Sequence, residues 1–216
     1  MRESKIRKLK ITIWLPLLVL MIGIAIVSPL VHLSYSSNRE RNKTVAQLNA
    51  QTYSERMRSE LYKGVAVVNA LEQILISENG AVNQFDTIAQ NLMTSYIQCI
   101  QLAPDGVVNS IYPLEGNEEG KIDLINDPER GELSRYARDT GKMVMQGPFA
   151  LKQGGTGIAI RKPVYLPLGR VGEDTSFWGF SIAVIKVPKI FDDSIGALTD
   201  FGYDYKLTKK SNVDGL

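Results

Sequence analysis

Hydrophobic residues are concentrated near the N-terminus, where residues 11–33 contain no Asp, Glu, Lys or Arg. A helix needs about 20 such residues to cross the hydrocarbon core of a bilayer. The segment before it, residues 1–10, is rich in positive charge and holds Arg2, Lys5, Arg7, Lys8 and Lys10. The positive-inside rule places such a segment in the cytoplasm. We therefore predict a cytoplasmic tip at 1–10 and a transmembrane helix at 11–33. A cleaved signal peptide is the alternative, which the length of the apolar run disfavours.

A long helix is the prediction for residues 34–78, because no proline occurs between Ser36 and Ala103. The first half of this helix is polar, so it is a solvated arm or the stalk of a parallel dimer. The second half carries an apolar stripe with steps of three and four residues, which lie on one helical face: Met57, Leu61, Val65, Val68, either Leu71 or Glu72, and Leu75. Gly64 weakens a helix by about 1 kcal/mol relative to Ala, and we interpret it as a point of close packing.

Beyond residue 78 the pattern alternates between strand-like and helix-like segments. The predicted strands are Ser95–Ala103, Val107–Tyr112, Met143–Leu151, Ile158–Leu166 and Phe177–Val187. The predicted helices are Phe85–Thr94, Asp127–Thr140 and Pro188–Leu198. Pro104-Asp105-Gly106 forms a turn, and Gly141 ends a helix in the left-handed conformation. We expect an α+β domain over residues 79–200: a PAS-like five-stranded antiparallel sheet with helices on one face.

Charge and composition exclude several function classes. The formal net charge is +2, and since residues 1–10 are strongly basic, the remainder is slightly acidic, which argues against nucleic-acid binding. Cys99 is the only cysteine, so an internal disulfide and a Cys-based zinc site are impossible. His32 is the only histidine and lies at the end of the apolar segment, so the body has no His to serve a catalytic triad. We expect no enzymatic activity, no cofactor and no metal site in this chain.

A set of short motifs follows in a characteristic order: Tyr112–Glu118, Asp127–Arg130, Ala137–Lys142, Gly147–Gly157, Arg161–Tyr165 and Phe177–Phe180. Together, over about residues 60–200, they resemble the CHASE domain. That domain is the extracytoplasmic sensor of bacterial diguanylate cyclases and histidine kinases and of plant cytokinin receptors. The resemblance implies a stalk helix, a dimer and a ligand in a PAS-like lobe. It also implies a smaller membrane-proximal lobe, which would begin at residues 201–216, and a second transmembrane helix leading to a cytoplasmic enzyme. We therefore expect the front part of a longer sensor, or a stub without its own output.

The candidate ligand-binding residues lie between residues 123 and 161. The resemblance implies that Asp123 binds the polar edge of a ligand, that backbone groups of Met145 contact it, and that Thr156 on the next turn does so too. Gly155 lies in a glycine-rich turn that brings backbone N–H groups to an anion, or simply needs positive φ. Arg161, if it points inward, suits a carboxylate or phosphate; the alternative is a solvated Arg161, and for Asp123 a plain loop position.

The resulting hypothesis is a membrane-anchored sensor with its domain outside the cytoplasm. Its small-molecule ligand would be purine-like or anionic, and Asp123 and Arg161 would face one cavity from opposite walls. We expect a homodimer formed through the stalk helix. The alternative is a non-catalytic dimerisation or protein-interaction module without a small-molecule ligand.

Overall fold

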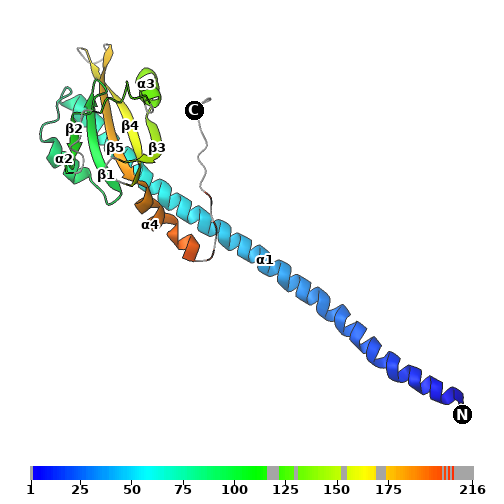
Figure 1. The fold of residues 1–216 in the computed structure, drawn as a ribbon. Helices are drawn as coiled ribbons and strands as arrows, with labels where there is room; N and C mark the ends of the chain where they lie inside the picture. The colour runs from blue at the N-terminus through cyan, green and yellow to red at the C-terminus, as the bar shows by residue number, and fades with distance from the viewer. Residues whose placement is uncertain are drawn as a thin grey trace. The chain divides into compact units, whose positions relative to one another are not determined.

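The computed structural model describes residues 2–115, 122–128, 131–151, 155–168 and 174–200, together with 202, 204 and 206. The chain divides into two compact units, Met1–Gln51 and Thr52–Leu216. Helix α1 (Arg2–Ser77) supplies the whole of the first unit and continues into the second (Figure 1). Residues 201–216, predicted as the start of a second lobe, lie almost wholly outside the described residues.

In the first unit, α1 is apolar on all sides and exposed from Trp14 to Tyr35. A helix that is hydrophobic all round is stable only when buried in a protein or in a membrane. By length and composition this is the one described helix able to cross a membrane. The first unit therefore fits a membrane protein, in line with the predicted span. Pro16 and Pro29 both lie inside the continuous helix.

The second unit is built on a five-stranded sheet with the order β2-β1-β5-β4-β3 (Figure 1). The strands are β1 (Ile97–Pro104), β2 (Ser110–Tyr112), β3 (Val144–Ala150), β4 (Thr156–Pro167) and β5 (Thr175–Lys186). All four pairings are antiparallel. The other helices are α2 (Phe85–Leu92), α3 (Gly131–Thr140) and α4 (Val187–Asp200). The predicted α+β sheet domain is thus confirmed.

Each face of the sheet is covered, whereas the sequence predicted helices on one face only. On the first face, which we call the α1 face, Val68, Leu71 and Leu75 of α1 pack with residues of α2 and α4 against β1, β4 and β5. On the opposite face, the α3 face, Ala137 of α3 is fully buried among residues of the sheet. The prediction was wrong on this point because the central strands are apolar on both faces, which gives no polar side to leave open.

The apolar stripe predicted on α1 is the surface that meets the sheet. Val68, Leu71 and Leu75 have no exposed surface, and Met57, Leu61 and Val65 pack partly buried beside them. Gly64 lies at the closest approach: a Cβ there would come within 2.7 Å of Ile160 Cδ1. The glycine therefore lets α1 pack closely on β4, as predicted.

Two local features of the fold are the start of α3 and the position of Pro163. The helix predicted from Asp127 is described from Gly131 onward, and residues 129–130 lie outside the described residues; the Gly131 N–H donates to the Asp127 carbonyl at 2.9 Å. Pro163, which a central strand position disfavours, lies in β4 beyond Arg161, where the ladder between β3 and β4 ends. A missing N–H at Pro163 therefore costs no hydrogen bond to β3.

Candidate functional site

Two buried polar side chains, Gln101 and Arg161, lie on the α3 face along one line across the sheet. Pairing places Gln101 of β1 opposite Ile182 of β5, Ile182 opposite Arg161 of β4, and Arg161 opposite Val144 of β3. Paired residues on neighbouring strands point to the same face. We call these four residues the Arg161 row. Its Arg161 end lies beneath α3, which packs on β3 and β4.

Arg161 is the largest fully buried side chain in the described part of the chain, at 2% exposure. Its Nη1 donates to Ser134 Oγ of α3 at 3.2 Å and to Gln146 Oε1 of β3 at 2.5 Å. The guanidinium keeps its charge at every physiological pH, so its burial is costly and needs good acceptors. Both of these acceptor atoms are uncharged oxygen atoms. Arg161 thus points inward, and three elements position it.

Gln101 and Cys99 extend this polar region on β1. Gln101 is 8% exposed, and its Nε2 donates to Cys99 Sγ at 3.3 Å, a weak acceptor. Burial raises the pKa of the Cys99 thiol to about 11, so the sulfur is protonated and inert at neutral pH. Sequence reasoning missed Gln101, although a glutamine inside the apolar run from Ile97 to Ala103 was a usable signal.

Contacts at both ends hold α3 over the Arg161 row. Near its start, Arg135 Nη1 donates to the Ile125 carbonyl at 2.6 Å. Near its end, the Tyr165 hydroxyl donates to the Arg138 carbonyl. The left-handed Gly141, at φ +69°, then closes the helix by donating to the Ala137 carbonyl at 2.9 Å. This is the stop predicted from the sequence.

Asp123 uses its carboxylate within its own turn. Oδ1 accepts the backbone N–H groups of Ile125 at 3.1 Å and Asn126 at 3.0 Å, and Oδ2 accepts Asn126 Nδ2 at 2.8 Å. These bonds, first that from the Asn126 side chain, lower the pKa of the Asp123 carboxyl. The carboxylate therefore closes a local turn, and none of these bonds reaches Arg161.

The remaining candidates lie elsewhere on the sheet. Met145, 38% exposed, pairs with Ile160, whose side chain belongs to the α1 face. Thr156 lies four residues before Ile160 on β4, so it points to that same face. Gly155 has φ +80° and accepts the Leu151 N–H at 3.0 Å, which makes it part of the β3–β4 hairpin turn. Gly154 and its neighbours 152–153 lie outside the described residues. Only Arg161 of the five lies in the buried polar region.

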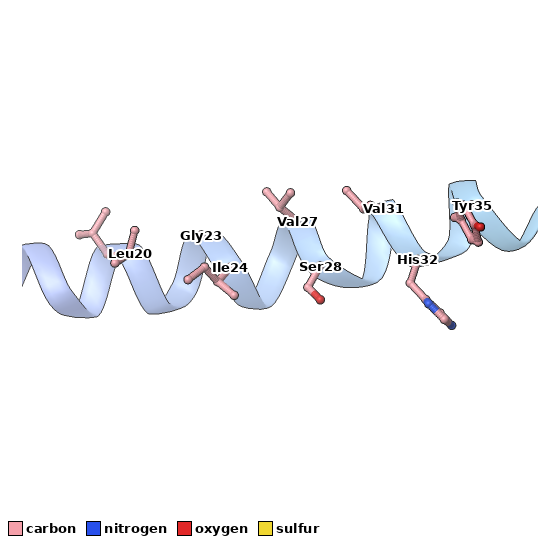
Figure 2. Close-up of a pocket in the computed structure, with 9 residues that line it drawn as sticks. Leu20, Gly23, Ile24, Val27, Ser28, Val31, His32 and Tyr35 are labelled. Atoms are coloured by element: carbon pink, nitrogen blue, oxygen red, sulfur yellow. The ribbon is translucent and has the colours of Figure 1, made fainter.

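A hollow of another kind lies on α1 in the first unit (Figure 2). It runs along one helix surface from Val19 to Tyr35 past Gly23, whose missing side chain leaves the space open. Its lining is apolar apart from a few groups such as Ser28 and His32. Within the predicted span, lipid would fill it. Among the described residues, no group of three or more His, Cys, Asp or Glu side chains could hold a metal ion.

Comparison with solved structures relates the fold to sensor domains. An extracellular ligand binding receptor from Desulfohalobium retbaense superposes with a TM-score of 0.54 at 18% identity, over 69% of this chain and 26% of that one. The chain thus spans about a quarter of that receptor's length. The ligand binding domain of the Pseudomonas aeruginosa PAO1 amino acid chemoreceptor PctC, in complex with GABA, gives a TM-score of 0.47 at 16% identity. That match covers 74% of this chain and 67% of the other.

Comparison with curated protein sequences gives no match. A family model, in contrast, matches residues 34–213, a range that takes in all of α1 beyond the apolar segment, the whole sheet and α4. The family is that of the CHASE domain, and the match extends further at both ends than the motifs recognised in the sequence. Combined with the sheet topology and the long N-terminal helix, it assigns this chain to the CHASE domain family, a family of sensor domains.

Proposed function

We propose that this chain is the ligand-sensing input of a membrane-anchored signal-transduction protein. Residues 11–33 anchor it, residues 1–10 lie in the cytoplasm, and the sheet domain lies outside. The family assignment supports a sensor, and the exposed apolar part of α1 supports an anchor. The basic residues before that segment support the orientation.

The observation that carries the ligand-binding part of this proposal is the buried Arg161 on the α3 face. A permanent cation at 2% exposure is expensive to maintain for stability alone, since an apolar side chain of similar volume is often as stabilising. Such groups are concentrated at binding sites, where they recognise anions with directional hydrogen bonds. The small molecule therefore binds on the α3 face, with Arg161 at the centre of its site.

The path from this site to the membrane leads through the sheet to α1. Lys162, next to Arg161, points to the other face and bonds to Glu72 Oε2 at 2.6 Å and to Asn69 Oδ1 at 2.7 Å, both on α1. Ser181, which pairs with Lys162, donates to the Val68 carbonyl at 3.0 Å. These contacts fix the position of α1 on the sheet. A ligand that favours one arrangement of β4 would shift α1 by no more than its differential affinity allows.

The proposed output rests on the usual arrangement of the family. CHASE domains precede cytoplasmic enzymes, so we propose that the full sensor is a diguanylate cyclase or a histidine kinase and that two copies associate through α1. The exposed apolar residues Val45 and Leu48, three positions apart in the first half of the stalk, support that association.

A binding screen tests the proposal. The full chain, in lipid nanodiscs, is titrated calorimetrically with a panel of carboxylates, nucleobases, sugars and amines, and hits are repeated with Arg161→Ala. We expect saturable binding of one chemical class and its loss in the variant. If no compound binds and chemical crosslinking recovers a protein partner instead, the chain is an interaction module and the sensor proposal is wrong.

A further inference from the structure

We infer that the hollow on α1 between Val19 and Tyr35 is the docking surface for the same helix of a second copy of this chain, and that the two helices lie parallel and in register. The contact continues from the apolar segment into the stalk as far as Leu48. This inference rests on the association through α1 proposed above, and it adds the surface, the direction and the number of copies.

A single line of positions, with alternating steps of four and three residues, runs along α1 in the first unit. Inside the predicted span it passes through the hollow, and outside the span it reaches exposed apolar side chains of the stalk. Such steps average about 3.5 residues, the repeat that keeps one stripe of a helix against a parallel partner over many turns. We call this line the α1 seam, and its positions are Leu20, Ile24, Val27, Val31, Ser34, Asn38, Arg41, Val45 and Leu48.

The hollow has the shape that a neighbouring helix needs. Gly23 lies beside the seam, and nothing lies within 4 Å of the position that a Cβ would take there. Figure 2 shows Val27 and Val31 projecting to the same side of the helix, a short distance along from this glycine. A small residue beside projecting apolar ones lets another backbone approach closely, which is how helices associate inside membranes. Ser28, which also lines the hollow, is of the small polar type found at such contacts.

The part of the seam outside the span indicates a protein partner. Around a single copy, lipid would fill the hollow, but lipid does not reach Val45 and Leu48, which are 42% and 58% exposed. At about 1.5 Å per residue, Val45 lies roughly 18 Å along the helix from the end of the span at residue 33. One partner helix that continues through both regions covers the hollow and the apolar stalk residues together.

The direction of the helices favours a second copy of α1 as that partner. Every copy carries the basic segment 1–10, so all copies cross the membrane in the same direction. A two-fold axis between two parallel helices places each seam residue next to the same residue of the other copy. Apolar seam positions then meet apolar ones along the whole contact, on both sides of the membrane surface.

The polar seam positions lie together between Ser34 and Arg41, and they favour two helices in register. The Asn38 amide both donates and accepts, so two Asn38 side chains bond to each other when the helices are parallel and unshifted. A single Asn at such a position fixes the register and the number of helices in parallel coiled coils, at some cost in stability. Arg41 is long enough to extend its charge from the seam into water.

Cysteine crosslinking of the full chain in proteoliposomes maps the contact. Cys99 is first replaced by Ala, and single cysteines are then introduced one at a time. We expect Ile24→Cys and Leu48→Cys to form disulfide-linked dimers under mild oxidation. Ile22→Cys and Ala50→Cys lie on the opposite side of the helix, where the two Cα atoms are too far apart for a disulfide, so they should remain monomeric.

Matched substitutions test the hollow and the register, with association measured by energy transfer between labelled copies at varied lipid ratios. Gly23→Ile fills the hollow, so we expect it to weaken association roughly 10- to 100-fold. Ala25→Ile adds a similar side chain on the other side of the helix and should leave association within about threefold. Asn38→Val should tighten association and yield species larger than dimers. Gln47→Val, which lies off the seam, should do neither.

The outcomes separate this inference from the sensor proposal. Crosslinking that is equal at all four cysteine positions, or stronger at Ile22→Cys and Ala50→Cys, would overturn the inference and leave the sensor in place. Equal effects of Gly23→Ile and Ala25→Ile would also overturn it and leave lipid as the occupant of the hollow. A chain that stays single at every lipid ratio would contradict both the inference and the proposed association through α1. Ligand binding is tested independently by the Arg161→Ala titration.

Discussion

Replacing Gly64 by Ala tests whether α1 is held at its closest approach to the sheet. A Cβ at this position would lie 2.7 Å from Ile160 Cδ1 and 2.9 Å from Ile185 Cδ1, well inside the separation of about 3.5–4.0 Å at which carbon atoms attract. Helix propensity alone favours Ala by about 1 kcal/mol. Overpacking a core by a methyl group costs about 1–3 kcal/mol. We therefore expect Gly64→Ala to lower the free energy of unfolding by about 1 kcal/mol.

A double substitution separates these two effects. Ile160→Val removes the Cδ1 atom that the new methyl group would meet, and alone it should cost about 1 kcal/mol. In the Ile160→Val background, Gly64→Ala should become neutral or stabilising, because the helix gain remains while the clash is reduced. Ala66→Gly, at an exposed position two residues along α1, measures the propensity difference in the same helix without any contact to the sheet.

Urea unfolding of the full chain in mild detergent measures these changes. The fluorescence of Trp178, which packs against the α1-face core, is followed in a Trp14→Phe background. If Gly64→Ala is more stable than the parent by about 1 kcal/mol, which is the value that propensity alone predicts, then α1 has room to move away from the sheet and the close-packing argument is wrong.

Three further predictions concern single contacts. Lys162→Met should cost about 2 kcal/mol, because it leaves the Glu72 carboxylate partly buried without its cation, and Lys162→Met/Glu72→Met should recover most of that loss in a double-mutant cycle. Cys99 should resist thiol reagents at pH 8, where a pKa of about 11 leaves roughly a thousandth of it ionised. Because the pKa of the Cys99 thiol is raised in the folded state, its contribution to the free energy of unfolding should be fully present below the unfolded pKa of about 8.5 and decline as pH rises towards 11. Labelling of Cys99 in native buffer as fast as in urea would contradict the raised pKa and, with it, this pH dependence. Gly141→Ala should lower the free energy of unfolding by about 1 kcal/mol from the left-handed φ alone, since nothing lies within 4 Å of the Cβ that Ala would add. An equal loss for Gly141→Asn, which tolerates this conformation better, would count against that cause.

The fold could be predicted largely because its turns and helix ends are determined by local sequence. Pro104-Asp105-Gly106 turns the chain with Asp105 and Gly106 at positive φ, and Gly141 ends α3 in the same way. The stripe of apolar residues on α1 has a single period, so its buried face could be read from spacing alone. Each of these features depends on a few neighbouring residues.

The site could not be predicted in the same way, because it depends on which face of the sheet each side chain occupies. The central strands are apolar on both faces: in β5, Phe180 and Ile182 belong to the α3 face, while Ala183 and Ile185 belong to the α1 face. Such strands give no alternation from which to choose a side. The inward position of Arg161 and the position of α3 above it are therefore settled only by tertiary contacts.

The two cations at the centre of β4, Arg161 and Lys162, contact helices on opposite faces of the sheet. Successive residues of a strand point to opposite faces, so Arg161 reaches Ser134 of α3 while Lys162 reaches Glu72 and Asn69 of α1. Because one peptide bond joins Arg161 and Lys162, a movement of β4 at Arg161 would also change the contacts of Lys162 with α1. Interior packing resists gradual deformation and favours discrete alternatives, so a ligand at Arg161 would select between arrangements of β4 on α1. Under the proposed function, the adjacency of these two residues would couple the site to α1 without any contact between ligand and α1.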